Sequence, residues 1–179
     1  MMSENKKMVP CSIFFVKGVG VHPIEIVSFD LALKDAGIET FNLVPVSSIC
    51  PPGCKIVTPE EGLKQLSPGE IVFCIMARNQ TNIPGRKLGA SIGVAIPSDK
   101  ETFGYLGEYW TFDGEVERIA ELSQNIAKTM LANKLGMDVE DGKQLSTGKI
   151  SKIFDVTQVS EGDKDGVWTT TVAAAIFVL

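Results

Sequence analysis

The sequence predicts an α+β fold in which helices lie outside a mostly antiparallel sheet. Three observations support this class: the chain carries six or seven segments of strand character, it carries only two long segments of helical period, and the two types do not alternate strictly. Hydrophobic residues make up 44% of the 179 residues and charged residues 22%, which is an ordinary globular composition. We therefore expect a single domain over residues 1–179.

The N-terminal elements are predicted from strand propensity and from the residues that start and stop helices. Residues 10–17 are rich in Ile, Phe and Val and predict the first strand. Residues 18–23 then predict a glycine-rich turn, with Pro23 at the first helical position. A helix is predicted from about residue 24 to 36, ending at Gly37 as a left-handed cap.

The rest of the chain is predicted to be strand-rich, with one further long helix. A loop over 51–69 carries at most one helical turn, and residues 78–86 form a turn-rich connector. The long helix runs from 114 to 135, with Asp113 as N-cap, Gly136 as terminator and an apolar stripe that faces the sheet. Further strands are predicted at 40–46, 69–77, 87–97, 102–112, 149–160 and 167–178.

Charge and residue counts limit the classes of partner. A net charge of −5 argues weakly against nucleic acid or an anionic membrane as a partner. No apolar run approaches the length of a membrane span and the polar start lacks a signal core, so we expect a cytoplasmic protein.

The single histidine and four cysteines argue against a metal centre built on these residue types. With His22 as the only histidine, a histidine-rich site is impossible, and we expect this residue at the helix entry. Cys50 and Cys54 have a spacing compatible with zinc, but the other two cysteines lie within predicted strands. We expect buried or loop thiols, and no metal.

The strand over 40–46 runs into a Ser47-Ser48 pair and is stopped by Pro51 and Pro52. One interpretation is a polar strand end. The other is self-cleavage, in which the second serine attacks the carbonyl of the first.

Motifs spread in order over residues 10–137 favour the second interpretation. Taken together, these motifs closely resemble those of the pyruvoyl-dependent arginine decarboxylases. The resemblance implies a four-layer αββα sandwich with two long helices, assembled as a homotrimer or a dimer of trimers with active sites between neighbouring subunits. The residues that carry it are Phe29-Asp30, Ala36-Gly37-Ile38, Asn42-Leu43, Ser47-Ser48-Ile49, Pro51-Pro52, Pro84-Gly85, Ala95-Ile96-Pro97, Asp99-Lys100 and Gly107-Glu108-Tyr109.

The resemblance also implies the chemistry. Ser48 Oγ attacks the Ser47 carbonyl, the chain separates into 1–47 and 48–179, and Ser48 becomes an N-terminal pyruvoyl group, the only cofactor, without metal or pyridoxal phosphate. This ketone forms a Schiff base with the substrate amine and accepts electrons as carbon dioxide leaves. The implied reaction converts L-arginine to agmatine and carbon dioxide.

Roles for individual residues come from the same resemblance. Glu108, in an aromatic strand where burial would raise its pKa, is the acid that returns a proton to the substrate. Asn42 polarises the cleavage-site carbonyl or orients the pyruvoyl group, and Asp30 binds the guanidinium. Ser47 and Ile49 contribute to substrate binding. The residues alone favour a strand-surface carboxylate for Glu108, and they leave open an outward-facing strand residue for Asn42 and an exposed helix charge for Asp30.

Two alternatives to arginine decarboxylation stay open at this point. One is the same chemistry on another amino acid, since residues 17–23 carry no acidic side chain where some relatives do. The other is an unprocessed homologue that serves as a trimeric binding or scaffold protein.

Overall fold

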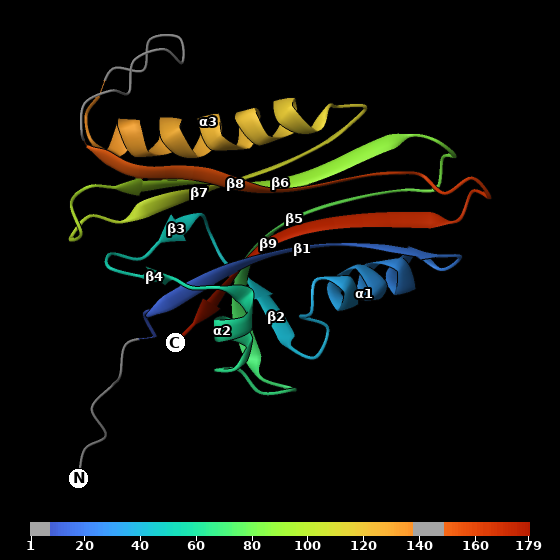
Figure 1. The fold of residues 1–179 in the computed structure, drawn as a ribbon, viewed down its shortest axis with the longest axis horizontal. Helices are drawn as coiled ribbons and strands as arrows, with labels where there is room; N and C mark the ends of the chain where they lie inside the picture. The colour runs from blue at the N-terminus through green and yellow to red at the C-terminus, as the bar shows by residue number, and fades with distance from the viewer. Residues whose placement is uncertain (1–7, 138–148) are drawn as a thin grey trace.

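Two β-sheets stack face to face, and a helix covers the outer face of each (Figure 1). The computed structural model describes residues 8–137 and 149–179. This arrangement of helix, sheet, sheet and helix confirms the predicted α+β sandwich and its four layers. None of the helices in the described part of the chain is long and apolar enough to cross a membrane.

The first sheet has the strand order β2-β5-β9-β1-β4. Its central strands pair antiparallel, whereas β2 pairs parallel to β5 and β4 parallel to β1 at the two edges. The strands are β1 (Ser12–His22), β2 (Asn42–Pro45), β4 (Lys55–Ile56), β5 (Ile71–Thr81) and β9 (Trp168–Val178).

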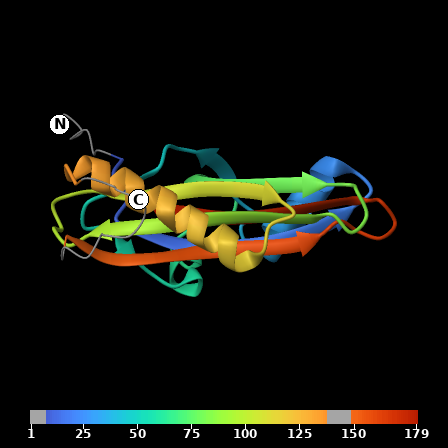
Figure 2. The same ribbon diagram turned by 90° about the horizontal axis from the view of Figure 1, so that it is seen from above.

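The second sheet is antiparallel throughout, with the order β3-β7-β6-β8. Helix α1 (Glu25–Asp35) packs on β1 and β9 of the first sheet, and α3 (Val116–Lys134) packs obliquely across β6, β7 and β8 of the second (Figure 2). The short α2 (Pro59–Leu63) lies beside β1. The strands are β3 (Ile49–Cys50), β6 (Lys87–Pro97), β7 (Gly104–Phe112) and β8 (Ile150–Glu161).

The main core lies between the sheets and is formed by alternate residues of their central strands. Ile75 of β5, Ile92 of β6 and Ala175 of β9 are all fully buried there. A second apolar layer, which includes Phe14 and Ala32, fills the space between the first sheet and α1. Both faces of the first sheet are thus covered, which explains the continuous apolar run over residues 172–178 of β9.

The predicted turn over 18–23 is wrong, because β1 continues to His22. Gly18 and Gly20 lie within the strand, and an added Cβ at Gly20 would lie 2.1 Å from the Ser28 carbonyl oxygen. These glycines therefore allow the backbone of α1 to pack directly on β1. Pro23 precedes the N-cap residue Ile24 and is not the first helical residue.

His22 Nδ1 accepts a hydrogen bond from the Ile24 amide at 3.0 Å, which places the histidine at the helix entry as expected.

Two further predictions need correction. Residues 78–81 belong to β5, where they pair with β9, so the connector is shorter than predicted. Asp113 is not the N-cap of α3: its φ is 57°, and Glu115 takes the cap position without a side-chain cap bond. The other predicted strands and helices begin or end within a few residues of the observed ones.

Both predicted helix terminators are confirmed. Gly37 has φ 73°, its amide donates to the Lys34 carbonyl, and the Ile38 amide donates to the Leu33 carbonyl. Gly136, with φ 62°, ends α3 with the same pair of bonds. Each glycine supplies the left-handed residue of a Schellman motif.

Replacing Gly20 by alanine should destabilise the fold, because the new Cβ would collide with the backbone of α1. We expect a loss of about 1–3 kcal/mol, typical of overpacking. Thermal denaturation at fixed protein concentration would measure it. Val21→Ala, at an exposed position on the same strand, is the matched control and should change stability by less than about 0.5 kcal/mol. Equal melting temperatures for the two variants would contradict this account of the packing.

Candidate active site

The Ser47–Ser48 peptide lies where the chain passes from one sheet to the other. β2 pairs with β5 as far as Pro45, and the Val46 amide still donates to the Cys74 carbonyl at 2.9 Å. The chain then enters the second sheet, where the Leu106 amide donates to the Ser48 carbonyl at 2.9 Å. The bond between the two serines is thus anchored on one side to each sheet.

A hydrogen bond polarises the carbonyl of this peptide. The Ile49 amide donates to the Ser47 carbonyl oxygen at 2.8 Å, which closes a three-residue turn centred on Ser48. Neither serine has positive φ, and the described residues contain no cis peptide bond. The turn therefore orients and polarises the Ser47 carbonyl while both serines keep negative φ.

No sheet hydrogen bond depends on this peptide. Within the described residues, neither the Ser47 amide nor the Ser48 amide donates a hydrogen bond. Ser47 is exposed and Ser48 is half-buried. Breaking the bond would therefore leave both new ends held by their neighbours, Val46 by β5 and Ser48 by β7.

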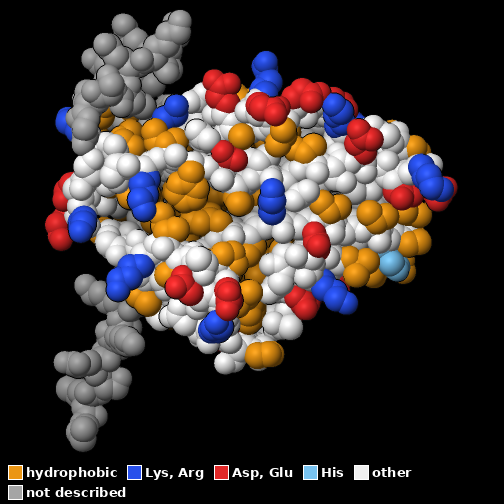
Figure 3. All heavy atoms as spheres, viewed as in Figure 1, with side chains coloured by type: hydrophobic (Ala, Val, Ile, Leu, Met, Phe, Trp, Pro, Cys, Tyr) orange, Lys and Arg blue, Asp and Glu red, His pale blue; other side chains and the backbone are white. Residues whose placement is uncertain are grey.

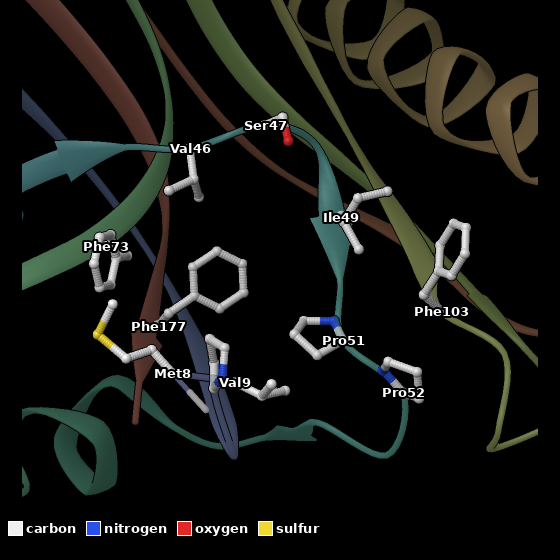
Figure 4. A pocket seen from close by; sticks show the side chains of 11 residues that line it. Met8, Val9, Val46, Ser47, Ile49, Pro51, Pro52, Phe73, Phe103 and Phe177 are labelled. Atoms are coloured by element: carbon white, nitrogen blue, oxygen red, sulfur yellow. The ribbon is translucent and has the colours of Figure 1, made fainter. Parts of the chain in front are cut away.

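An apolar cavity of about 520 Å³ adjoins Ser47 (Figure 4). Val46, Phe73 and Phe177 lie on one side of it, and Ile49 and Phe103 lie on the other. Ser47 carries the only polar side chain among its described lining residues, none of which is acidic. The cavity suits a methylene chain, whereas a guanidinium group would need its counter-charge from elsewhere.

Glu108 lies on β7, two residues beyond Leu106, which binds Ser48. Because side chains alternate along a strand, Glu108 lies on the same face as Leu106, toward the first sheet. In the single chain its side chain is exposed, yet neighbouring atoms still desolvate the carboxylate and raise its pKa. The direction of this shift agrees with the prediction from its aromatic strand.

Asn42 lies away from the serine pair. Its side-chain amide donates to the Gly69 carbonyl at 2.7 Å and so fixes the start of β2. Five residues of extended chain separate it from Ser47, which corresponds to about 16 Å. Asn42 instead lines a second cavity of about 590 Å³ together with Phe29, Leu33 and Arg78.

Asp30 is exposed on α1, next to Phe29. Helix α1 covers the outer face of the first sheet, so that sheet lies between Asp30 and the carboxylate of Glu108 (Figure 1). Within one chain the structure therefore brings together Ser47, Ser48, Ile49 and Glu108. Asn42 lines the second cavity and Asp30 lies on the helix outside the first sheet, so neither is grouped with the serine pair.

Sequence reasoning missed three contributors to these groups. The Ile49 and Leu106 amides act through the backbone, for which no residue type is a signal. Arg78 lies 3.9 Å above the Phe29 ring, and desolvation lowers its pKa. It was missed because its segment reads as a connector.

Among the described residues, no three or more His, Cys, Asp or Glu side chains cluster in a way that could hold a metal ion. Cys50 is buried at the end of β3, and Cys54 is partly exposed just before β4.

Comparisons with known proteins identify the family of this chain. The sequence profile of the family described as pyruvoyl-dependent arginine decarboxylase matches residues 12–179. A protein of Chloroherpeton thalassium named "Probable pyruvoyl-dependent arginine decarboxylase" is 49% identical over 178 residues, covering 95% of this chain and 98% of the relative. "Pyruvoyl-dependent arginine decarboxylase 2" of Methanosarcina mazei is 48% identical over 180 residues, covering 96% and 98%. The protein named "Pyruvoyl-dependent arginine decarboxylase" of Methanococcoides burtonii is 48% identical over 181 residues, covering 96% and 100%. A match that spans both sheets, the crossover between them and the β7 carboxylate shows that this chain belongs to the pyruvoyl-dependent arginine decarboxylase family.

Proposed function

We propose that this chain cleaves itself between Ser47 and Ser48 and then decarboxylates L-arginine to agmatine and carbon dioxide. The observation that carries the proposal is the turn in which the Ile49 amide polarises the Ser47 carbonyl, next to the Ser48 hydroxyl. The names of the relatives support arginine as the substrate.

Cleavage begins when Ser48 Oγ attacks the Ser47 carbonyl carbon. The carbon–nitrogen bond breaks, the hydroxyl proton passes to the Ser48 nitrogen, and an ester joins the two residues. The Ile49 amide stabilises the oxygen on which negative charge develops. Loss of the Ser48 α-proton then expels the Ser47 carboxylate and leaves dehydroalanine. Its imine tautomer takes up water and releases ammonia, which converts position 48 to a pyruvoyl group.

The residues around Ser48 fit such a group. The Leu106 amide holds the carbonyl of residue 48, and an apolar cavity lies beside Ser47. When present, the pyruvoyl group supplies an electron sink for decarboxylation. The protein's own contribution is a proton, and Glu108 is placed on the adjacent strand to return it to the substrate α-carbon. Because desolvation raises its pKa, Glu108 retains this proton at a higher pH than an ordinary carboxyl.

We further infer that a second subunit completes the site. Asp30 lies on the helix outside the first sheet, Asn42 is about 16 Å of extended chain from Ser47, and the cavity beside Ser47 contains no acidic side chain among the described residues. In a homotrimer, or a dimer of trimers, Asp30 from a neighbouring chain would pair with the substrate guanidinium. Asn42 from that chain would orient the pyruvoyl group.

Exposed apolar side chains near the crossover offer a surface for this association. Val44, Val46 and Ile49 are each 37% exposed, and Trp110, near Glu108 on β7, is 57% exposed. On the face of the molecule that Figure 3 shows, apolar side chains gather between scattered charged ones. Such patches are typical of interfaces between chains.

Ser48→Ala should leave a single uncleaved chain, since it removes the attacking oxygen and keeps the surrounding turn. Ser47→Ala is the matched control and should still separate into two chains, because it retains the carbonyl that is attacked. Denaturing electrophoresis of the purified variants would show the difference. Cleavage of the Ser48→Ala protein would rule out this nucleophile.

Glu108→Gln should process normally but lose decarboxylation by about 100-fold or more, the usual contribution of a general acid. In the parent protein, kcat should fall as pH rises through the raised pKa of Glu108, since only the protonated carboxyl donates. Agmatine formation measured across pH would show this fall in kcat. Glu121→Gln, an exposed substitution on α3, should leave the pH dependence of kcat unchanged. A fully active Glu108→Gln enzyme would refute the acid role.

Asp30→Asn should raise KM for arginine by about 10-fold or more, which corresponds to the loss of a charged hydrogen bond. If the site lies between subunits, co-expression of Asp30→Asn with Glu108→Gln should recover activity, because some interfaces in the mixed oligomer pair the two intact residues. Each variant expressed alone is the control. If the mixed oligomers are no more active than the single variants, Asp30 and Glu108 act in the same chain.

A further inference from the structure

Two thiols lie next to each other immediately after the cleavage site. Cys50 ends β3, Cys54 directly precedes β4, and both side chains line the same cavity. Both are free cysteines. The proposed function uses neither of them.

A tight turn brings the pair together. The Cys54 amide donates to the Pro51 carbonyl at 3.2 Å, and Gly53 has φ 67°. Proline at the second position and glycine with positive φ at the third are typical of a type II turn. Because both prolines restrict the backbone, the two sulfurs are held close before any bond forms.

A cavity gives small molecules access to the pair. Cys50 is only 2% exposed and Cys54 is partly exposed, but both line a cavity of about 410 Å³. Polar residues Asp99, Lys100 and Ser151 line the same cavity. A charged, water-soluble oxidant can therefore reach the sulfurs from this side.

The environment also favours reaction at Cys50. The hydrogen bond from the Cys54 thiol lowers the pKa of Cys50, and the same bond raises the pKa of Cys54. Thiolates, not thiols, are the reactive form of cysteine. By contrast, desolvation raises the pKa of the buried Cys74 to about 11.

Cys50 is linked to the cleavage site through the pairing of β3 with β7. It pairs with Gly104 on β7, Ile49 pairs with Tyr105, and the next bond along the same edge joins Ser48 to Leu106. A covalent bond that pulls Cys50 toward Cys54 would therefore shift the short strand that holds residue 48.

We propose that Cys50 and Cys54 form a reversible disulfide and that this bond lowers turnover at the pyruvoyl site. The oxidant is a low-molecular-weight disulfide. The Cys50 thiolate attacks one of its sulfurs, forms a mixed disulfide and releases one thiolate. Cys54 then gives up its proton and displaces the second thiol, so that two electrons pass from the protein to the oxidant. The effect on turnover, but not the disulfide itself, rests on the proposed function.

The test treats the purified protein with oxidised glutathione, alkylates the remaining free thiols, and measures both intact mass and agmatine formation. Oxidised parent protein should lack alkyl groups at Cys50 and Cys54 and lose activity by about tenfold or more, equivalent to about 1.4 kcal/mol in the barrier. Dithiothreitol should restore both readouts. Cys54→Ser should stay active under the same treatment, whereas Cys11→Ser, which removes an exposed thiol outside the pair, should behave like the parent.

Three results would overturn the proposal: alkylation of both Cys50 and Cys54 after oxidation, a disulfide without loss of activity, or equal inhibition of Cys54→Ser. The Ser48→Ala precursor provides an independent readout, because its thiols can be oxidised and alkylated although it forms no pyruvoyl group. If Ser48→Ala forms the disulfide but the parent protein does not decarboxylate arginine, the disulfide proposal stands and the proposed function fails.

Discussion

The position of the Ser47–Ser48 peptide depends on two edge pairings, β2 with β5 and β3 with β7. Val46 is bonded to the first sheet and Ser48 to the second, so the peptide between them must span the gap at the open edge of the sandwich. This constraint exposes the Ser47 carbonyl, turns the Ile49 amide toward it and leaves the peptide outside both hydrogen-bond ladders. The same geometry would hold both ends in place after cleavage, as a site built on a chain terminus requires.

The separation of the site residues has a clear cause in the layering. Glu108 belongs to the second sheet and Asp30 to the helix outside the first, and stacked sheets lie about 10 Å apart. In the proposed site, the serine pair and Glu108 therefore lie on one side of the first sheet, and Asp30 lies on the other. The proposed association of chains would bring these residues to one substrate, and the apolar residues exposed at the crossover offer a surface for it.

Much of this could be predicted from the sequence where local patterns decide the structure. The apolar stripe of α3, the terminators Gly37 and Gly136, and the Ser-Ser-Ile-x-Pro-Pro segment all have short-range signals. The extension of β1 through Gly18 and Gly20 does not, because glycine is a poor strand former and its use here depends on contact with a helix later in the chain. The polar end of β5 was missed for a similar reason, since only its pairing with β9 makes it a strand. The two-residue strands β3 and β4, and the backbone amides that hold Ser47 and Ser48, have no residue pattern at all.

Denaturing intact-mass analysis of the purified protein would test self-cleavage between Ser47 and Ser48 most directly. We expect two chains, residues 1–47 and 48–179, and the larger one should have the mass expected after loss of ammonia at residue 48. A single unmodified chain, or two chains in which residue 48 is still serine, would contradict it.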